Sequence, residues 1–388
     1  NNILYHHHGS FDLQGHKLRT GGYYSAWNSQ RTLNMENAIV SVHHNPGRAW
    51  WINGQNFELL AENSTLINRS NGGSIITENG DFIQYNNIIV VGSGDSIANF
   101  NNTVQYNVVN LKGSVNPLMG DFIADTVLIN GQSSAMFGHS ETNVVIINGN
   151  NGSINNHHEI ERCIVNKKAK ISGNNQIAYC VFNDDGTFLG QNVFDTLILY
   201  PGQGNASNQG NWFYFGIDSV QTINDSLYIR GNQCSNMNIA TSPPNSAKVA
   251  WLQKDTGFDV SADYLNIYNV GAKSDGDVTF YAGANSTPLP DPDLPPPGWV
   301  FENAQGYIPG LPDSDHYCEG DDYAIDATAF NGDPSTQYFW EGSATPGGLY
   351  YPVTEPGTDT IEVVYFEGCS LKDTITVQRY YPPEATIP

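Results

Sequence analysis

Short apolar runs recur along the first 300 residues at a nearly constant interval, and Asn, Gly, Asp or Ser residues separate each run from the next. Helical patterning is almost absent. A constant period predicts a solenoid, in which each repeat forms one coil and its strands pair with the neighbouring coils about 4.8 Å away. Seven runs align with spacings of 20, 18, 18, 18, 17 and 17 residues at Ile89, Val109, Val127, Val145, Cys163, Cys180 and Leu197.

Alternation within each run predicts which side chains point into the coil. We expect Val127 and Ile129 to stack on Val145 and Ile147 of the next coil. A β-sandwich also has short strands, but they are antiparallel and have no reason to keep one period over seven runs. The pattern therefore predicts a right-handed parallel β-helix over residues 1–302. Further strands are expected at 37–42, 57–60, 226–230, 264–268 and 299–301, with a hairpin-like cap at 11–18.

Asparagine occupies the same place at the end of four consecutive runs. Stacked Asn side chains can hydrogen-bond along a ladder and hold a tight bend. The alternative is that Asn simply favours turns, but four residues in register favour the ladder. The predicted ladder comprises Asn130, Asn148, Asn166 and Asn183.

Two of the five cysteines, Cys163 and Cys180, fall at equivalent positions of adjacent coils. One strand spacing is close enough for a disulfide in principle. In-register neighbours on parallel strands rarely have suitable side-chain directions, so we favour two buried, reduced thiols that act as small apolar residues. Cys234 has no obvious partner.

The pattern changes after a proline-rich segment at 288–298, which is extended and excluded from a central strand. We predict a linker at 303–316, a small immunoglobulin-like or PKD-like β-sandwich at 317–380, and a linker to a further domain at 381–388. Trp340 is expected in the core of the sandwich. A disulfide between Cys318 and Cys369 would stabilise such a small secreted domain by roughly 2–4 kcal/mol.

Charge and composition narrow the function classes. Lys and Arg total 16 and Asp and Glu total 39, which gives a net charge of −23. This balance argues against nucleic acid or an anionic membrane as a partner, because both require basic patches. No apolar stretch is long enough to span a bilayer, and no signal peptide begins the chain. Both ends read as cuts in a longer chain.

Several stretches resemble a known group of proteins. Residues 193–197, 221–227, 231–234 and 260–301 are similar to the β-helical repeats of Bacteroidota surface proteins. Residues 318–320, 340–345, 367–369 and 373–377 resemble the PKD-like or Ig-like modules of the same proteins. The resemblance implies export by the type IX secretion machinery and display on the cell surface, where some relatives are gliding-motility adhesins. It carries no shared catalytic motif.

Parallel β-helices include polysaccharide lyases and hydrolases, so a catalytic function is an alternative. Hydrolases need two carboxylates across a cleft, and lyases pair a base with Arg or Lys. Acids on a solvated face are the ordinary interpretation, and fold does not imply function. The charged candidates are Asp121, Asp125, Glu159, Glu161, Asp184, Asp185 and Arg162.

Metal binding has two candidate sets. The histidines of 6–8, 43–44 and 157–158 lack an HExxH or paired-cysteine motif, so we expect most of them to be exposed turn residues. An acid-rich junction offers the oxygen ligands that Ca²⁺ prefers, although a solvated acidic linker is the simpler alternative. The junction residues are Asp313, Asp315, Asp321 and Asp322.

Together these patterns predict a structural and adhesive module of a large secreted surface protein that is not an enzyme. Its expected partners are surface glycans or other cells. The alternative is a β-helix that binds or degrades polysaccharide. Paired aromatics such as Trp50-Trp51, Tyr23-Tyr24 and Trp212-Phe213-Tyr214 either stack on sugars or line the solenoid.

Overall fold

The computed structural model describes residues 2–301 apart from 44–45, 81–82, 102, 203–208, 232–234, 244–247, 284 and 290–295. Beyond 301 it describes 314–318, 324–326, 337–341, 343, 345, 347–348, 350–353, 355–365 and 369–380. Every regular element within these ranges is a β-strand. Over the same ranges no helix is long and apolar enough to cross a membrane.

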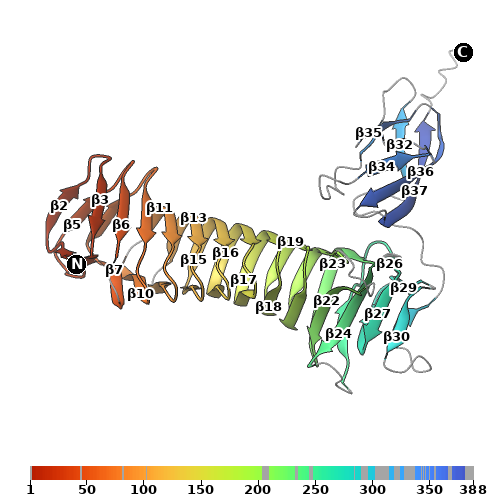
Figure 1. Cartoon of the computed structure of the whole chain (residues 1–388), viewed down its shortest axis with the longest axis horizontal. Coiled ribbons are helices and arrows are strands. Elements are labelled where there is room, and N and C mark those ends of the chain that lie inside the picture. The colour runs from red at the N-terminus through yellow and green to blue at the C-terminus, as the bar shows by residue number, and fades with distance from the viewer. Residues whose placement is uncertain are drawn as a thin grey trace, which may run out of the picture.

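The first 300 residues form a parallel β-solenoid, a long rod that begins at the N-terminus and ends near the C-terminal sheets (Figure 1). Each strand pairs in parallel with the equivalent strand one coil away, so the backbone hydrogen bonds run along the rod. The strands are β1 Ile3–Tyr5, β2 Gly9–Asp12, β3 Lys17–Thr20, β4 Gly22–Ser25, β5 Arg31–Asn34, β6 Ile39–Val42, β7 Gly47–Gly54, β8 Phe57–Leu60, β9 Thr65–Asn68, β10 Gly73–Gly80, β11 Ile83–Val90, β12 Ser96–Phe100, β13 Val104–Leu111, β14 Pro117–Met119, β15 Phe122–Ile129, β16 Ala135–Ile147, β17 Gly152–Val165, β18 Ala169–Gly173, β19 Gln176–Phe182, β20 Gly186–Gly190, β21 Val193–Leu199, β22 Gln209–Gly216, β23 Val220–Ile229, β24 Asn236–Ser242, β25 Ala250–Gln253, β26 Val260–Ala262, β27 Leu265–Tyr268, β28 Val270–Lys273, β29 Phe280–Ala282, β30 Thr287–Leu289 and β31 Trp299–Val300.

The register confirms the predicted stacking from Val109 to Leu197, but the first member of the alignment is wrong. Val109 pairs with Ile88, and Ile89 pairs with Asn110. Ile88 is fully buried, whereas Ile89 points to the outer side and is partly exposed. A shift of one residue along a strand moves a side chain to the opposite face. The apolar run at 88–91 has little alternation, so the sequence pattern did not fix its phase.

The core consists of columns of apolar side chains that run along the inside of the rod. Ile129, Ile147, Val165, Phe182 and Leu199 form one such column through consecutive register pairs. All five are fully buried. Each apolar side chain removed from water contributes roughly 1.5–3 kcal/mol, so these columns hold the coils together.

Two corners of the coil require glycine, because the backbone of the neighbouring coil lies where a side chain would begin. A Cβ added at Gly131 would overlap the carbonyl oxygen of Gly113, and one at Gly149 would overlap that of Gly131. Gly138 and Gly173, at another corner, also have positive φ values of 105° and 113°. Stacked glycines therefore let successive coils approach at the strand spacing.

The predicted hairpin-like cap at 11–18 is wrong. β2 pairs in parallel with β5, and β3 pairs in parallel with β6, so neither pairs with the other. Gln14 and Gly15 between them adopt φ values of 49° and 72°, which turn the chain from one side of the coil to the next. A Gly-containing turn between two short strands has the same sequence signature in a hairpin and at a solenoid corner.

The C-terminal strands form a four-stranded sheet in the order β32-β37-β36-β34 and a two-stranded sheet of β33 and β35. Trp340 is buried, as predicted, and donates from Nε1 to the carbonyl of Gly348 at 3.0 Å. The apolar cluster around it also includes Val181 and Ile198 of the solenoid's outer side. The strands are β32 Ser314–Cys318, β33 Ala324–Asp326, β34 Gln337–Trp340, β35 Tyr350–Pro352, β36 Gly357–Tyr365 and β37 Cys369–Tyr380.

Candidate functional site

The four predicted ladder residues are joined by amide hydrogen bonds between neighbouring coils. The side-chain Nδ2 groups of Asn148, Asn166 and Asn183 donate to the Oδ1 atom of the preceding asparagine, each at 2.8 Å. Asn130 extends the ladder by donating to Asn110 at 2.9 Å. The comparison of repeats within the sequence missed Asn110, because Asn110 is not the register partner of Asn130. Leu111 pairs with Ile129, so Lys112 holds the position equivalent to Asn130.

A second polar ladder lies inside the rod. Its one signal in the sequence is the 17-residue spacing of Asn175 and Asn192. Asn175 Nδ2 donates to Asn192 Oδ1 at 2.7 Å, and Asn192 Nδ2 donates to Gln221 Oε1 at 2.8 Å. All three residues are fully buried. Because buried polar groups are costly unless paired, this chain of bonds is structural.

Cys163 and Cys180 are both buried free thiols, as favoured from the sequence. Burial, together with the neighbouring Cys163, raises the pKa of the Cys180 thiol well above its usual value. A thiol that stays protonated is a poor nucleophile and a poor metal ligand. This pair therefore fills the core and carries no chemistry.

The backbone register does not bring Cys318 and Cys369 together. Cys318 pairs with Tyr380, the last residue of β37, whereas Cys369 is the first residue of that strand and pairs with Tyr365. In this register the two cysteines lie at opposite ends of β37. The side chains of both cysteines lie outside the described residues, and the disulfide stays a prediction.

The predicted calcium ligands are not placed. Asp313, Asp321 and Asp322 lie outside the described residues. Only the backbone of Asp315 is described, in β32, where it pairs with Val377. The calcium site stays a prediction.

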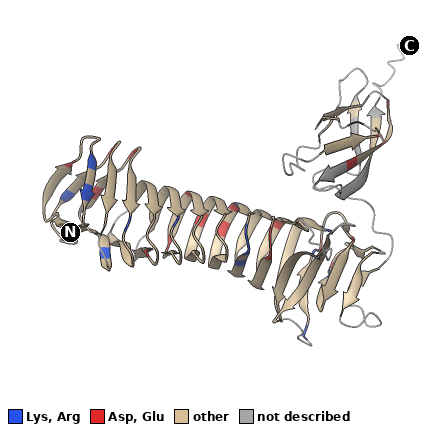
Figure 2. Cartoon of the chain, viewed as in Figure 1, with Lys and Arg blue, Asp and Glu red and all other residues tan. Residues whose placement is uncertain are grey.

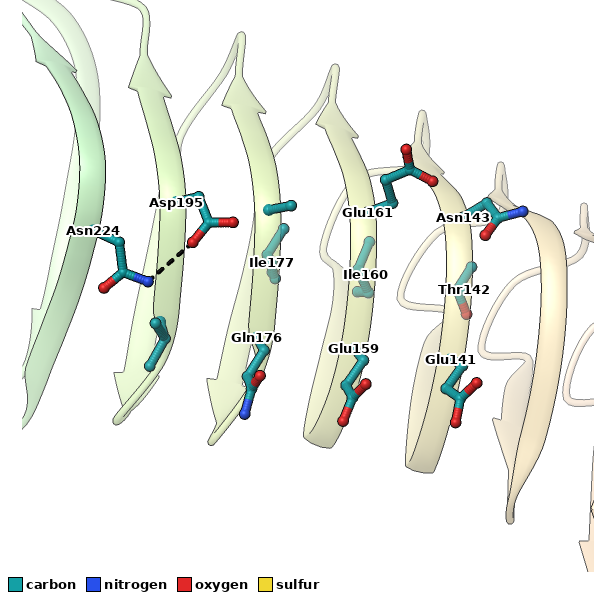
Figure 3. A pocket seen from close by; sticks show the side chains of 12 residues that line it. Glu141, Thr142, Asn143, Glu159, Ile160, Glu161, Gln176, Ile177, Asp195 and Asn224 are labelled. Atoms are coloured by element: carbon teal, nitrogen blue, oxygen red, sulfur yellow. Dashed lines mark hydrogen bonds between the residues drawn. The ribbon is translucent and has the colours of Figure 1, made fainter.

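A shallow, open groove of about 330 Å³ crosses the middle coils of the solenoid. Figure 3 shows Glu141, Glu159 and Gln176 in one row along it, with Glu161 and Asp195 toward its other side. The row follows from the register, because Glu141 pairs with Glu159 and Glu159 pairs with Gln176. The remaining residues that line the groove are Thr142, Asn143, Ile160, Ile177, Ala178, Val193 and Asn224.

The charges of this groove are of one sign. Its lining includes four carboxylates and no Lys or Arg, and acidic positions recur along the middle coils in Figure 2. Arg162, the basic candidate, lies over the ring of Tyr179 with its Cζ atom 5.7 Å from the centroid. The groove thus offers acids without the basic partner that a lyase requires.

The other candidate acids make local structural contacts. Asp125 accepts from Asn143 Nδ2 at 3.0 Å. Asp184 accepts the backbone N–H of Asp185 at 2.7 Å, and Asp185 accepts that of Trp212 at 2.8 Å. Asp184 and Asp185 lie between strands, where such bonds are typical of turn acids. Asp125 lies within β15 and contacts Asn143 of the groove lining, but it is not itself a lining residue.

Two histidines predicted as exposed turn residues are buried. His158 lies in β17, where Nε2 donates to the Asn155 carbonyl at 2.8 Å and Nδ1 is 2.7 Å from the Ser140 hydroxyl. Burial lowers the pKa of His158 to about 4, so its ring is neutral at pH 7. His6 is buried in the same manner, with Nδ1 2.6 Å from the Tyr23 hydroxyl. Strand alternation is the signal in the sequence that bears on these runs, because it turns neighbouring side chains to opposite faces.

Three aromatic rings form a platform on the outer surface near the C-terminal end of the rod. The Trp212 ring stacks on that of Tyr214, with centroids 5.7 Å apart and planes 13° apart, and it contacts the Tyr268 ring in a tilted arrangement at 5.5 Å and 31°. All three rings are partly exposed. The small Ala240 stands between Tyr214 and Tyr268 in the register, which leaves room for the rings to meet. We call Trp212, Tyr214 and Tyr268 the aromatic platform.

The sequence left open whether the paired aromatic residues line the solenoid or lie on its surface, and the structure shows that each group does both. Phe213, between its two members, is fully buried, and so are Tyr23 and Trp50. Tyr24 and Trp51 face outward with Trp212 and Tyr214. Each pair or triplet therefore divides between core and surface, as the two-residue period of a strand requires.

No protein-family model, curated protein or solved structure matches this chain. The class defined by the fold is the parallel β-solenoid. That class includes both enzymes and non-enzymes, so function has to be argued from the surface sites.

Proposed function

We propose that the chain is a structural and adhesive module of a large secreted bacterial cell-surface protein, of the kind found in gliding-motility adhesins. A solenoid suits this task because its backbone hydrogen bonds and apolar columns run along the axis and make a stiff rod. Export by the type IX secretion machinery and an extracellular, surface location belong to the same proposal. An immunoglobulin-like or PKD-like fold for residues 317–380 would make that part a spacer.

The observation that carries the adhesive part is the aromatic platform. The faces of aromatic rings carry partial negative charge and attract the polarised C–H groups of a sugar ring. Trp212 and Tyr268 contribute two partly exposed rings from different coils, and the Asp185 carboxylate accepts the backbone N–H of Trp212. The site therefore suits a neutral glycan.

The acidic groove is the place where the enzyme alternative would lie. It holds Glu141 and Glu159 in one row and Glu161 and Asp195 toward its other side. A glycosidase requires a general acid and a second carboxylate on opposite sides of the scissile bond. None of the groove residues belongs to the aromatic platform, so we propose glycan binding without cleavage and test cleavage separately.

The test is a glycan array probed with the full chain, followed by calorimetry with the strongest ligand. Removal of two platform rings in a Trp212→Ala/Tyr268→Ala double variant should weaken binding by roughly 2 kcal/mol, about 30-fold. Phe258→Ala is the matched control, because Phe258 is the most exposed large apolar residue of the described chain at 81% and lies outside the platform. This control should bind as the unmodified chain does.

A reducing-sugar assay on the bound glycan separates binding from degradation. We expect no release of reducing ends. Release that survives in the platform variant but is lost in Glu159→Gln would favour the degrading alternative. Absence of binding to every glycan, or equal weakening by Phe258→Ala, would refute the adhesive proposal.

A further inference from the structure

Two exposed histidines of adjacent coils lie side by side next to the row of Glu141, Glu159 and Gln176. His139 in β16 and His157 in β17 are register partners. Their rings stack with centroids 5.3 Å apart and planes 13° apart. Glu159, two residues beyond His157, points to the same outer side because strand residues alternate in direction. One potential ligand atom from each of the three residues lies within 4.8 Å of the others.

We propose that His139, His157 and Glu159 form a binding site for a divalent transition metal ion, with Zn²⁺ as the ion. Two imidazole nitrogens and one carboxylate oxygen match the donor types that Zn²⁺ prefers. Ca²⁺ and Mg²⁺ prefer sets made only of oxygen, so the two imidazoles distinguish this site from a general acidic surface.

The geometry requires only side-chain movement. Zn²⁺ holds nitrogen and oxygen ligands at about 2.0–2.2 Å, so ligand atoms around a tetrahedral ion lie about 3.4 Å apart. All three side chains are exposed, and exposed side chains rotate freely at little cost. The paired strands fix the Cα positions of His139 and His157 one strand spacing apart. Binding then needs no change in the backbone.

The surroundings favour a cation. Glu141 pairs with Glu159 on the neighbouring strand and adds a second carboxylate beside the site. The chain as a whole carries a net charge of −23, and no Lys or Arg lines the adjoining groove. Three protein ligands leave one tetrahedral position for water or for a donor from a bound molecule.

Isothermal titration of the full chain with ZnCl₂ tests the site. Every protein should carry His7→Asn and His8→Asn, because these N-terminal imidazoles are a second possible source of metal binding. We expect one Zn²⁺ per chain. His157→Ala and His139→Ala should each weaken Zn²⁺ affinity at least tenfold. Removal of a group that only supports a metal ligand already costs about tenfold in affinity, and loss of a ligand itself should cost no less. His16→Ala, which removes an exposed histidine elsewhere, is the matched control and should bind normally.

Two further readouts assign the ligands. Co²⁺ in place of Zn²⁺ should give a visible absorption band that disappears in the histidine variants, and CaCl₂ should not compete with Zn²⁺. Glu159→Gln should weaken binding while keeping the one-to-one stoichiometry. Equal melting temperatures of the apo proteins show that the exposed substitutions leave the fold intact. Absence of Zn²⁺ binding, or equal affinity in His139→Ala, His157→Ala and His16→Ala, would refute the site.

Discussion

Asn148 lies in the middle of the asparagine ladder, so its replacement removes two hydrogen bonds. Its Nδ2 group donates to Asn130, and its Oδ1 atom accepts from Asn166. Asn183 ends the ladder and makes one ladder bond, as donor to Asn166. Asn174, exposed on the outer side, takes no part in the ladder. The three residues thus form a series with two, one and no ladder bonds.

A hydrogen bond contributes about 0.5–1.5 kcal/mol net to stability. Ladder amides are exposed at Asn148 and Asn183, and water satisfies a partner that is left free, so the lower half of this range applies. We expect Asn148→Ala to reduce the free energy of unfolding by about 1–2 kcal/mol and Asn183→Ala by about half as much. Asn174→Ala should have almost no effect.

Thermal unfolding measures the series, with the largest decrease, about 2–4 °C, for Asn148→Ala. Solenoid coils can unfold in stages, so local stability should also be measured. The backbone amides of Asn148 and Asn166 donate to the Ile129 and Ile147 carbonyls, and their hydrogen exchange should report the local loss of stability. A double-mutant cycle on Asn130 and Asn148 isolates their coupling. Equal melting temperatures for Asn148→Ala and Asn174→Ala would refute the ladder as a stabilising element.

The corners and the core give two further predictions. Gly131→Ala should lower the unfolding free energy by about 1–3 kcal/mol in chemical denaturation, because its Cβ would overlap the Gly113 carbonyl oxygen. Gly216→Ala, whose two nearest contacts are side-chain atoms at 3.1 and 3.2 Å, should cost less, and the reverse order would contradict the close-approach argument. Burial raises the pKa of Tyr85 from 10.0 to about 12, so the unfolded chain releases this proton first and stability falls between pH 10 and 12 by about 2–3 kcal/mol. Burial also raises the pKa of Tyr23 and Tyr106, so Tyr85→Phe should make this part of the stability-pH curve less steep without flattening it. An unchanged slope would exclude a contribution from Tyr85.

Sequence reasoning succeeded where the coil length is constant. Between Val109 and Leu197 the register pairs follow the aligned positions, since residues 17 or 18 apart occupy the same place in successive coils. The asparagine ladder follows from the same arithmetic. The register and the ladder both repeat at a fixed spacing, so they can be recognised in a single sequence without a known structure.

The same reasoning failed where a phase or a direction had to be chosen. Ile88 and Ile89 are identical residues, so composition does not say which one is buried, and only pairing with Val109 decides. His157 and His158 raise the same difficulty, because one is exposed and the other is buried. The stacking of His139 on His157 also requires the register, since their 18-residue spacing has meaning only after the solenoid is known.

Coils of constant length and coils of longer length present different kinds of feature on the outer surface. In coils of equal length the same outward position recurs at every step, so a feature such as the ladder repeats along the axis and marks no single place. The ladder stops after Asn183 because Tyr200 takes the next position, and the following coil lengthens, with Leu197 paired to Leu227. That longer coil contains Trp212 and Tyr214, which meet Tyr268 in the aromatic platform. A rod whose interior enforces uniform stacking acquires a unique binding position where the period breaks, which is why the platform, rather than the groove over the regular coils, is the stronger candidate for glycan recognition.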